Sequence, residues 1–475
     1  MADDPTPPTD DSDDDRQPGV PGPEDALAKL LASLGIGTGG DLASLGSGSG
    51  SSEDLASLLE ELQKTLQQFT SQMAGFAAAG GEADGANWGF AKDIARKTVA
   101  QDGPDPTPSD AERREVREAV ALANLWLDQV IAFPQLTGDG VAWSRAEWVE
   151  HTFPVWQHLV GPIVASISRA LVEVARQDPD QPEQIRAMLQ PMMRTAAAGM
   201  FGGQVGQSIG KLAADVLGGT DVGLPVTPTP SVALLPANLA AFSAGLEQPA
   251  SDVRLYLALR ETARQRLFGA VGWLAPQMLA LVEHYAREIR IDPDGLERAI
   301  EEQMSGSGQP DLAKLEELGR DFAMRLFRPE RTAEQVEILS RLETLLALVE
   351  GWVDDVVSEA VASLMPNAVP LSEVLRRRRA SGGPAEQALR TLVGLELRPR
   401  RVRDAVNLWA ALRSARGSQE RDAAWAHPDL VPTSADLDDP LGYAEHGHHG
   451  EPDSLDAELA ELLGEDTTED DPPQE

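Results

Sequence analysis

Residues 257–274, LALRETARQRLFGAVGWL, lie within a longer segment, 249–290, whose apolar residues recur at helical spacing. The chain is rich in Ala and Leu, and aromatic residues make up 5% of it. This composition favours helices packed against one another over a β-sandwich or a barrel. With 475 residues, of which 42% are hydrophobic, the chain can bury a substantial core. We therefore predict a mainly α fold.

Composition changes on either side of the helical part. The first residues are rich in Asp, Pro, Gly and Ser, and the last are rich in Asp and Glu. Such segments are typically disordered and solubilising. The sequence predicts a disordered segment over 1–50, an amphipathic helix over 51–77, a linker over 78–87, a helical domain over 88–442 and a disordered acidic tail over 443–475.

Local signals mark individual helices inside the predicted domain. Ser109 is expected to cap a helix over 111–133, with Glu112 completing a capping box. A helix over 144–177 is expected to be interrupted near its two prolines, because proline removes a backbone donor and clashes with the preceding turn. The pattern also predicts the last core helices, which include 311–324, 332–363 and the segment that ends near residue 417.

The net charge, the cysteine content and the lengths of the apolar runs exclude several classes of function. The net charge is −37, and we expect no nucleic-acid partner, because phosphate binding needs a basic face. The basic run RRRR (376–379) is expected to be a helix end neutralised by the protein's own carboxylates. The chain has no cysteine, which rules out disulfides and thiolate zinc sites. No apolar run is long enough for a membrane span, and the N-terminus is acidic, unlike a signal peptide. We expect a cytoplasmic protein.

Residues 196–219, AAAGMFGGQVGQSIGKLAADVLGG, carry glycines three or four residues apart. A phosphate-binding loop would need the pattern G-x-x-x-x-G-K-[ST]. Here Val205 stands at the first Gly position, and Leu212 stands where Ser or Thr is required. The spacing instead predicts a helix whose small face allows another backbone to approach closely. The glycines concerned are Gly199, Gly203, Gly206 and Gly210.

Residues 260–264, Arg-Glu-Thr-Ala-Arg, have the spacing of the helical zinc motif H-E-x-x-H. Positions i and i+4 lie on one helix face, so two His at this spacing can bind one Zn²⁺. The Glu after the first His can then act as general base on a metal-bound water. Arginine stays protonated and is a poor metal ligand. The residues alone favour Arg260, Glu261 and Arg264 as a solvated or ion-paired helix face.

A second pair of carboxylates lies in LETLLALVEGWVDDVVSEAV, residues 342–361. Glu350 and Asp354 are also i and i+4 on one helix, and they match E-x-x-x-D, in which Glu can be a third zinc ligand and Asp an outer partner that orients a His. The motif alone is very common. Glu350, however, lies in an otherwise apolar run, where a carboxylate needs a partner. Its structural partner would be Arg260 or Arg264, and its functional partner a metal.

Several stretches together resemble one family. They are ANLWLDQVIAFPQ, GMFGGQVGQSIGKLA, LYLALRETARQRLFGAVGWL, LETLLALVEGWVDDVV, LRRRRASGGPAEQALRTLVGLELRPRRVRDAVNLWAAL and RDAAWAHPDLVPTSADLDDP. With them the sequence resembles the actinobacterial zincin-like, zinc-dependent metallopeptidases, formerly a family of unknown function. The resemblance covers 88–442 and implies a mainly helical, zincin-like fold with a zinc hydrolase site. It implies no particular substrate.

The family motif generally reads R/H-E-x-x-H, followed downstream by E-G-x-x-[DE]. By this resemblance Glu261 corresponds to the general base, Glu350 to a zinc ligand and Asp354 to its outer carboxylate. By the same resemblance, relatives also carry Arg at the position that corresponds to Arg260. Arg264 stands where the family generally has His, so this chain departs at the most diagnostic ligand.

Two functions remain open at this point. In the first, the zinc motif is degenerate, the protein is weakly active or inactive, and it binds an unknown peptide or protein. Arg264 would then pair with Glu350 in place of the metal's positive charge. In the second, the protein is an active metal-dependent peptidase or hydrolase with Glu261 as general base and substituted ligands. A site of carboxylates with few nitrogens would favour Mg²⁺ or Mn²⁺ over Zn²⁺.

The seven histidines offer few replacements for the missing ligand. His284 lies on the helical segment after residue 274 and could fold back, although a lone His in a helix is usually a half-buried polar residue. His151 and His158 share a helix face only if the helix continues between them. His427 is expected to pack or cap a loop. The tract HGHHG (446–450) can bind metal ions, as His-rich tracts do.

Overall fold

A computed structural model describes residues 87–174, 199, 201–288, 332–380, 386, 390 and 401–447. Over these residues the chain is mostly helical, which confirms the predicted fold class. None of the described helices is long and apolar enough to cross a membrane. The predictions for 1–50, 51–77 and 311–324, and for His448 and His449, lie outside the described residues.

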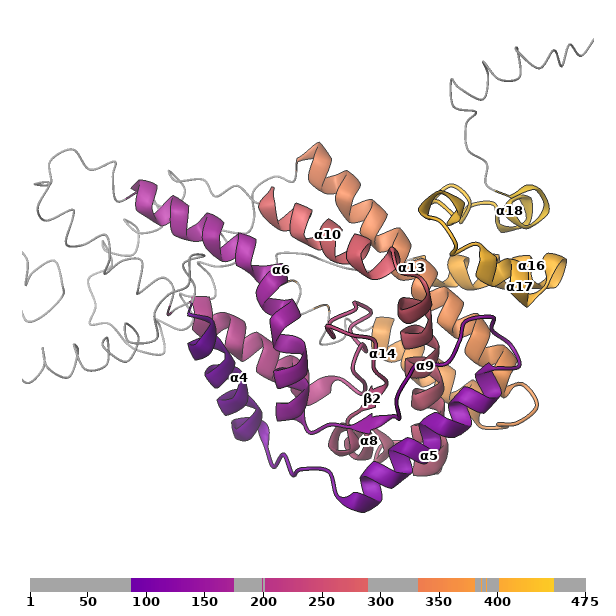
Figure 1. The fold of residues 1–475 in the computed structure, drawn as a ribbon, viewed down its shortest axis with the longest axis horizontal. Helices are drawn as coiled ribbons and strands as arrows, with labels where there is room; N and C mark the ends of the chain where they lie inside the picture. The colour runs from indigo at the N-terminus through magenta and orange to yellow at the C-terminus, as the bar shows by residue number, and fades with distance from the viewer. Residues whose placement is uncertain are drawn as a thin grey trace, which may run out of the picture. The chain divides into compact units, whose positions relative to one another are not determined.

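Figure 1 shows the order of the elements along the chain. Two short strands pair in parallel, with Val141 opposite Ala233 and Ala142 opposite Leu234. The elements are α4 (Trp88–Asp102), α5 (Asp110–Leu127), β1 (Val141–Ala142), α6 (Arg145–Val174), a helix over 201–215, β2 (Ala233–Leu234), α8 (Pro236–Ser243), α9 (Ala250–Ala270), α10 (Leu274–Arg287), α13 (Ala333–Val361), α14 (Ala368–Ala380), α16 (Val402–Arg416), α17 (Ser418–Ala423), a 3-10 helix (Pro428–Leu430) and α18 (Pro440–His446).

Helices α9 and α13 lie at the centre of the core. Residues 256–268 of α9 and 345–357 of α13 are buried without a break, so neither helix has a solvent-facing side over these turns. Helices buried on every side belong to the interior of a large core. The two helices contact each other, and α5, α8, α14 and β2 also contact α9. Polar side chains on these turns must therefore find partners inside the protein.

Two local predictions have different outcomes. Ser109 caps α5. The Glu112 carboxylate accepts a hydrogen bond from the Ser109 backbone N–H at 2.7 Å, which completes the predicted capping box. The expected interruption of the helix over 144–177 is wrong, because α6 runs through both Pro154 and Pro162. Each proline removes one backbone hydrogen bond, and a helix held by packing on both sides absorbs this loss by bending. The axis of α6 bends in Figure 1.

The C-terminal end of the predicted domain lies inside a helix. The boundary expected at residue 442 falls within α18, which begins after the capping residue Asp439. Tyr443 anchors this helix, because its ring is buried and its hydroxyl donates to the Leu430 carbonyl at 2.9 Å.

The predicted close approach of another backbone is confirmed at two of the four glycines, Gly206 and Gly210. The helix over 201–215 packs against α4 so closely that a Cβ on Gly210 would lie 2.7 Å from the carbonyl oxygen of Ala95. A Cβ on Gly206 would overlap the carbonyl oxygen of Ala91. Glycine at these positions allows the two backbones to approach, and no phosphate-loop geometry is needed to explain the spacing.

We expect Gly206→Ala to destabilise the protein by about 1–3 kcal/mol, because the added methyl group overlaps backbone that cannot rotate away. Gly203→Ala is the matched control. Its Cβ would meet the Phe90 ring at an ordinary 3.8 Å, and alanine is the better helix former. Urea denaturation of both variants measures the difference. Equal losses of stability in the two variants would contradict the close approach at Gly206.

Candidate functional site

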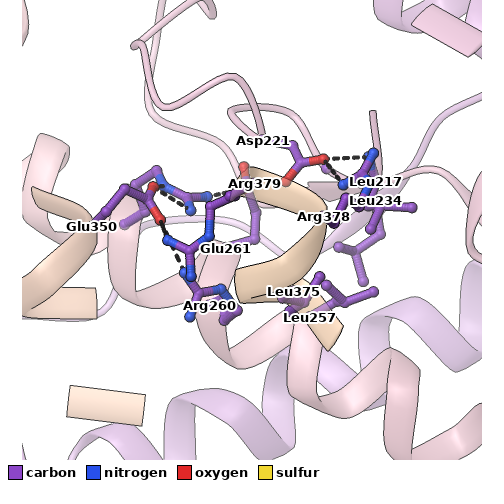
Figure 2. Close-up of a pocket in the computed structure, with 12 residues that line it drawn as sticks. Leu217, Asp221, Leu234, Leu257, Arg260, Glu261, Glu350, Leu375, Arg378 and Arg379 are labelled. Atoms are coloured by element: carbon purple, nitrogen blue, oxygen red, sulfur yellow. Dashed lines mark hydrogen bonds and ion pairs between the residues drawn. The ribbon is translucent and has the colours of Figure 1, made fainter. Parts of the chain in front are cut away.

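The buried charges of α9 and α13 meet where the two helices contact each other. Arg264 donates to Glu350 Oε1 from Nε at 3.0 Å and from Nη2 at 2.8 Å, and Arg260 Nη2 donates to Glu350 Oε2 at 2.9 Å. Arg260 also pairs with Asp354 through Nη1. All four side chains are at least nine-tenths buried. The i and i+4 spacing on each helix thus brings two arginines against two carboxylates. Figure 2 shows Arg260 and Glu350 of this group.

Helix α14 supplies a further arginine to the same carboxylates. Arg379 donates to Glu350 Oε2 at 2.7 Å and to Asp354 Oδ1 at 3.2 Å. Its neighbour Arg378 donates to Asp221 Oδ2 at 2.9 Å. The basic run 376–379 is therefore neutralised by the protein's own carboxylates, as predicted. The sequence did not indicate which carboxylates these would be.

Glu261 is held by a separate set of donors. Its Oε1 accepts from the Thr220 backbone N–H at 3.0 Å, from the Thr220 hydroxyl at 2.9 Å and from Gln265 Nε2 at 3.2 Å. Its Oε2 accepts from Arg264 Nη1 at 3.0 Å. A Cβ on Gly218 would lie 3.0 Å from Oε2, so glycine allows this loop to approach the carboxylate. We call the connected set the arginine–carboxylate network; its members are Arg260, Arg264, Arg379, Glu261, Glu350 and Asp354.

The three carboxyl groups of the network differ in their pKa. Burial alone would raise the pKa of Glu350, but Arg264, Arg379 and Arg260 outweigh it, and the pKa falls below its ordinary value. The pKa of Asp354 is likewise lowered by Arg260 and Arg379 against the effect of burial. The pKa of Glu261 shifts in the opposite direction. Burial raises its pKa, and its hydrogen bonds with Arg264, Gln265 and Thr220 do not compensate.

A small cavity lies beside the network. Its volume of about 30 Å³ is enough for one or two water molecules. Arginine and carboxylate side chains of the network line it together with apolar side chains from β2, α9 and α14 (Figure 2). The cavity leaves room for water near Glu261 and Glu350, but not for an extended peptide.

Comparison with known proteins identifies the family. The chain matches the zincin-like metallopeptidase family over residues 86–444. It belongs to this family. The fold is similar to a crystal structure of a candidate hydrolase with a novel fold from Chloroflexus aurantiacus, at 21% identity and a TM-score of 0.50. That match covers 76% of this chain and 98% of the other, and it supports the fold alone. No curated protein matches the chain.

The residues present at this site do not fit the zinc ion that the family name implies. Each carboxylate oxygen of Glu350 and Asp354 accepts at least one hydrogen bond from a guanidinium group. Arginine offers no lone pair to a metal and carries a permanent positive charge. A cation here would displace paired arginines and would face their charges at close range.

Histidine does not supply the missing ligand among the described residues. His284 Nε2 lies 3.1 Å from Glu334 Oε1. Glu334 precedes Glu350 by 16 residues on α13, which corresponds to about 24 Å along a helix. Among the described residues, one group of His and acidic side chains is close enough to share a metal, namely His284, Glu288 and Glu334. The central carboxylates do not belong to it.

The other described histidines have local roles. His151 stacks on Trp143 with ring centroids 4.4 Å apart, and His158 Nε2 lies 3.4 Å from Glu283. His427 accepts a backbone hydrogen bond at the start of the 3-10 helix, as the expected loop cap would.

Proposed function

We propose that this zincin-like metallopeptidase family member does not hydrolyse peptides with zinc, and that its arginine–carboxylate network takes the place of the metal centre. Its function would then rest on binding an unknown peptide or protein. One observation carries the proposal: Arg264, at the expected His position, contacts the expected zinc ligand Glu350 at 2.8 Å. A guanidinium group compensates the buried carboxylate that a metal would otherwise compensate.

The position of Glu261 supports the same conclusion. A general base needs an accessible lone pair directed at the water that it activates. Oε1 of Glu261 accepts hydrogen bonds from Thr220 and Gln265. Oε2 pairs with the guanidinium group of Arg264, which stands at the position of the expected metal ligand, so no metal-bound water faces this oxygen. The alternative, an active hydrolase with Glu350 and Asp354 as substituted ligands, requires Arg260, Arg264 and Arg379 to leave both carboxylates. The geometry favours the first proposal.

Zinc analysis tests the proposal. The parent protein is the full chain with His284, His446, His448 and His449 replaced by Ala, so that surface histidines contribute no metal. We expect the parent to retain no zinc after dialysis. The triple variant Arg260→His/Arg264→His/Arg379→Ala should gain a stoichiometric zinc ion, because it frees Glu350 and supplies both imidazoles of the helical motif. Elemental analysis measures both.

The control variant is Arg260→Gln/Arg264→Gln/Arg379→Ala, which removes the same charges without supplying an imidazole and should stay free of zinc. Zinc in the parent that Glu350→Gln removes would refute the proposal. A triple variant that binds no zinc would refute the idea that these arginines occupy the metal position. Peptide hydrolysis by the parent that Glu261→Gln abolishes would establish the active-enzyme alternative.

A further inference from the structure

A second cluster of potential metal ligands lies away from the central site, where α10 ends and α13 begins. It consists of His284, Glu288 and Glu334, whose ligand atoms all lie within 4.8 Å of one another. We propose that this cluster binds a divalent transition-metal ion of the Zn²⁺ type and thereby connects α10 to α13. The proposal does not depend on the state of the arginine–carboxylate network.

The local helix geometry brings the ligands together. His284 and Glu288 are i and i+4 at the end of α10, so both side chains project from one face. Glu334 lies in the first turn of α13, a helix that contacts α10, and its Oε1 is 3.1 Å from His284 Nε2. Two ligands on one zinc ion are at most about 4.2 Å apart. The partly exposed side chains can close the remaining distance by small rotations.

The charge of the cluster favours a cation. Glu288 and Glu334 converge on one point, and among the described residues neither forms an ion pair with Lys or Arg. The nearby Arg287 pairs with Glu283 instead. Two carboxylates held this close repel each other, and a divalent cation between them would relieve this repulsion. The C-terminal end of α10 adds a partial negative charge.

The ligand types indicate the class of metal. One imidazole nitrogen with two carboxylate oxygens suits Zn²⁺, Co²⁺, Ni²⁺ or Mn²⁺ better than Ca²⁺ or Mg²⁺, which take mainly oxygen ligands. Three protein ligands leave at least one coordination position for water. A plain ion pair between His284 and Glu334 is the competing explanation, and it requires neither Glu288 nor a metal.

Zinc titration of the full chain distinguishes these possibilities. The starting protein carries Ala at His446, His448 and His449, since the tail can bind metal by itself. We expect zinc to raise its melting temperature and to bind with one-to-one stoichiometry in calorimetry. His284→Ala and Glu288→Gln should each weaken zinc binding by about tenfold or more. Mg²⁺ at the same concentration should produce no shift.

The matched control is His158→Ala. His158 is also an exposed His near a Glu of α10, at 3.4 Å from Glu283, but no third ligand joins this pair. Zinc binding should survive this substitution unchanged. Zinc binding that is lost in His284→Ala but unchanged in Glu288→Gln would show a metal bound without Glu288 and would overturn the proposed three-ligand site. Absence of a zinc-induced shift in the starting protein would also overturn it.

Discussion

Replacing Glu350 by glutamine should lower the free energy of unfolding by about 3–5 kcal/mol, because it leaves buried guanidinium groups without their counter-charge. Glu350 accepts hydrogen bonds from Arg260, Arg264 and Arg379, and its side chain is 7% exposed. Glutamine has a similar shape but no charge, and its amide nitrogen would face arginine donors. The loss therefore reports electrostatic compensation rather than packing.

Glu261→Gln is the matched control on the same network. We expect it to change the free energy of unfolding by less than about 1 kcal/mol. Burial raises the pKa of its carboxyl group, so the surroundings of Glu261 stabilise the charged form less than those of Glu350 do. Glutamine retains an acceptor for the Thr220 donors, and Arg264 keeps Glu350 as its partner.

The opposite pKa shifts of Glu350 and Glu261 predict that their contributions to stability depend on pH in opposite ways. Because the pKa of Glu350 is lowered, its contribution to stability is complete above its ordinary value of 4.5 and is lost as the pH falls through its native value. The contribution of Glu261 is present below 4.5 and is lost as the pH rises through its raised native value. The difference between wild type and Glu350→Gln should therefore shrink below pH 4.5.

Urea denaturation of the three proteins at pH 7 and at acidic pH measures these effects. Equal losses of unfolding free energy in Glu350→Gln and Glu261→Gln would show that the two carboxylates contribute equally to stability, against this prediction. If the difference in unfolding free energy between wild type and Glu350→Gln stays constant with pH, the effect of the substitution comes from packing and not from charge.

The central pairing could be predicted from the sequence because it follows from burial. Glu350 stands in an apolar helical run, and Arg260 and Arg264 stand on another buried helix. A buried carboxylate needs a partner, and these arginines were the candidates with matching spacing. The mainly α fold could be predicted for a similar reason, since periodicity over long segments is the strongest local signal.

The other partners could not be predicted in the same way. Arg379 reaches Glu350 from α14, a helix that contacts α9, and no periodicity encodes where these helices meet. Thr220 binds Glu261 from a loop without a repeating pattern. The continuity of α6 through Pro154 and Pro162 also depends on packing, which overrides the local preference of proline.

A second buried network gives the other large expected effect. Arg421 lies on α17, and its side chain is fully buried against α13. Its Nε donates to Asp422 at 2.9 Å, and its Nη1 lies 3.1 Å from both Asp355 and Glu359. Its Nη2 donates to the Val130 carbonyl at 2.6 Å. One guanidinium group thus connects α13, α17 and the loop after α5.

Arg421→Met should cost about 3–5 kcal/mol of unfolding free energy, because it removes the counter-charge of the buried Asp422 and leaves Asp355 with Arg413 alone, while filling most of the volume. Arg413→Met is the control, since Arg413 also pairs with Asp355 and Glu359 but is 32% exposed. We expect a loss of about 1 kcal/mol or less there, because solvent replaces the lost charge. Thermal and urea denaturation would measure both. Similar losses would mean that the shared acidic partners, and not burial of the arginine, determine the stability of this network.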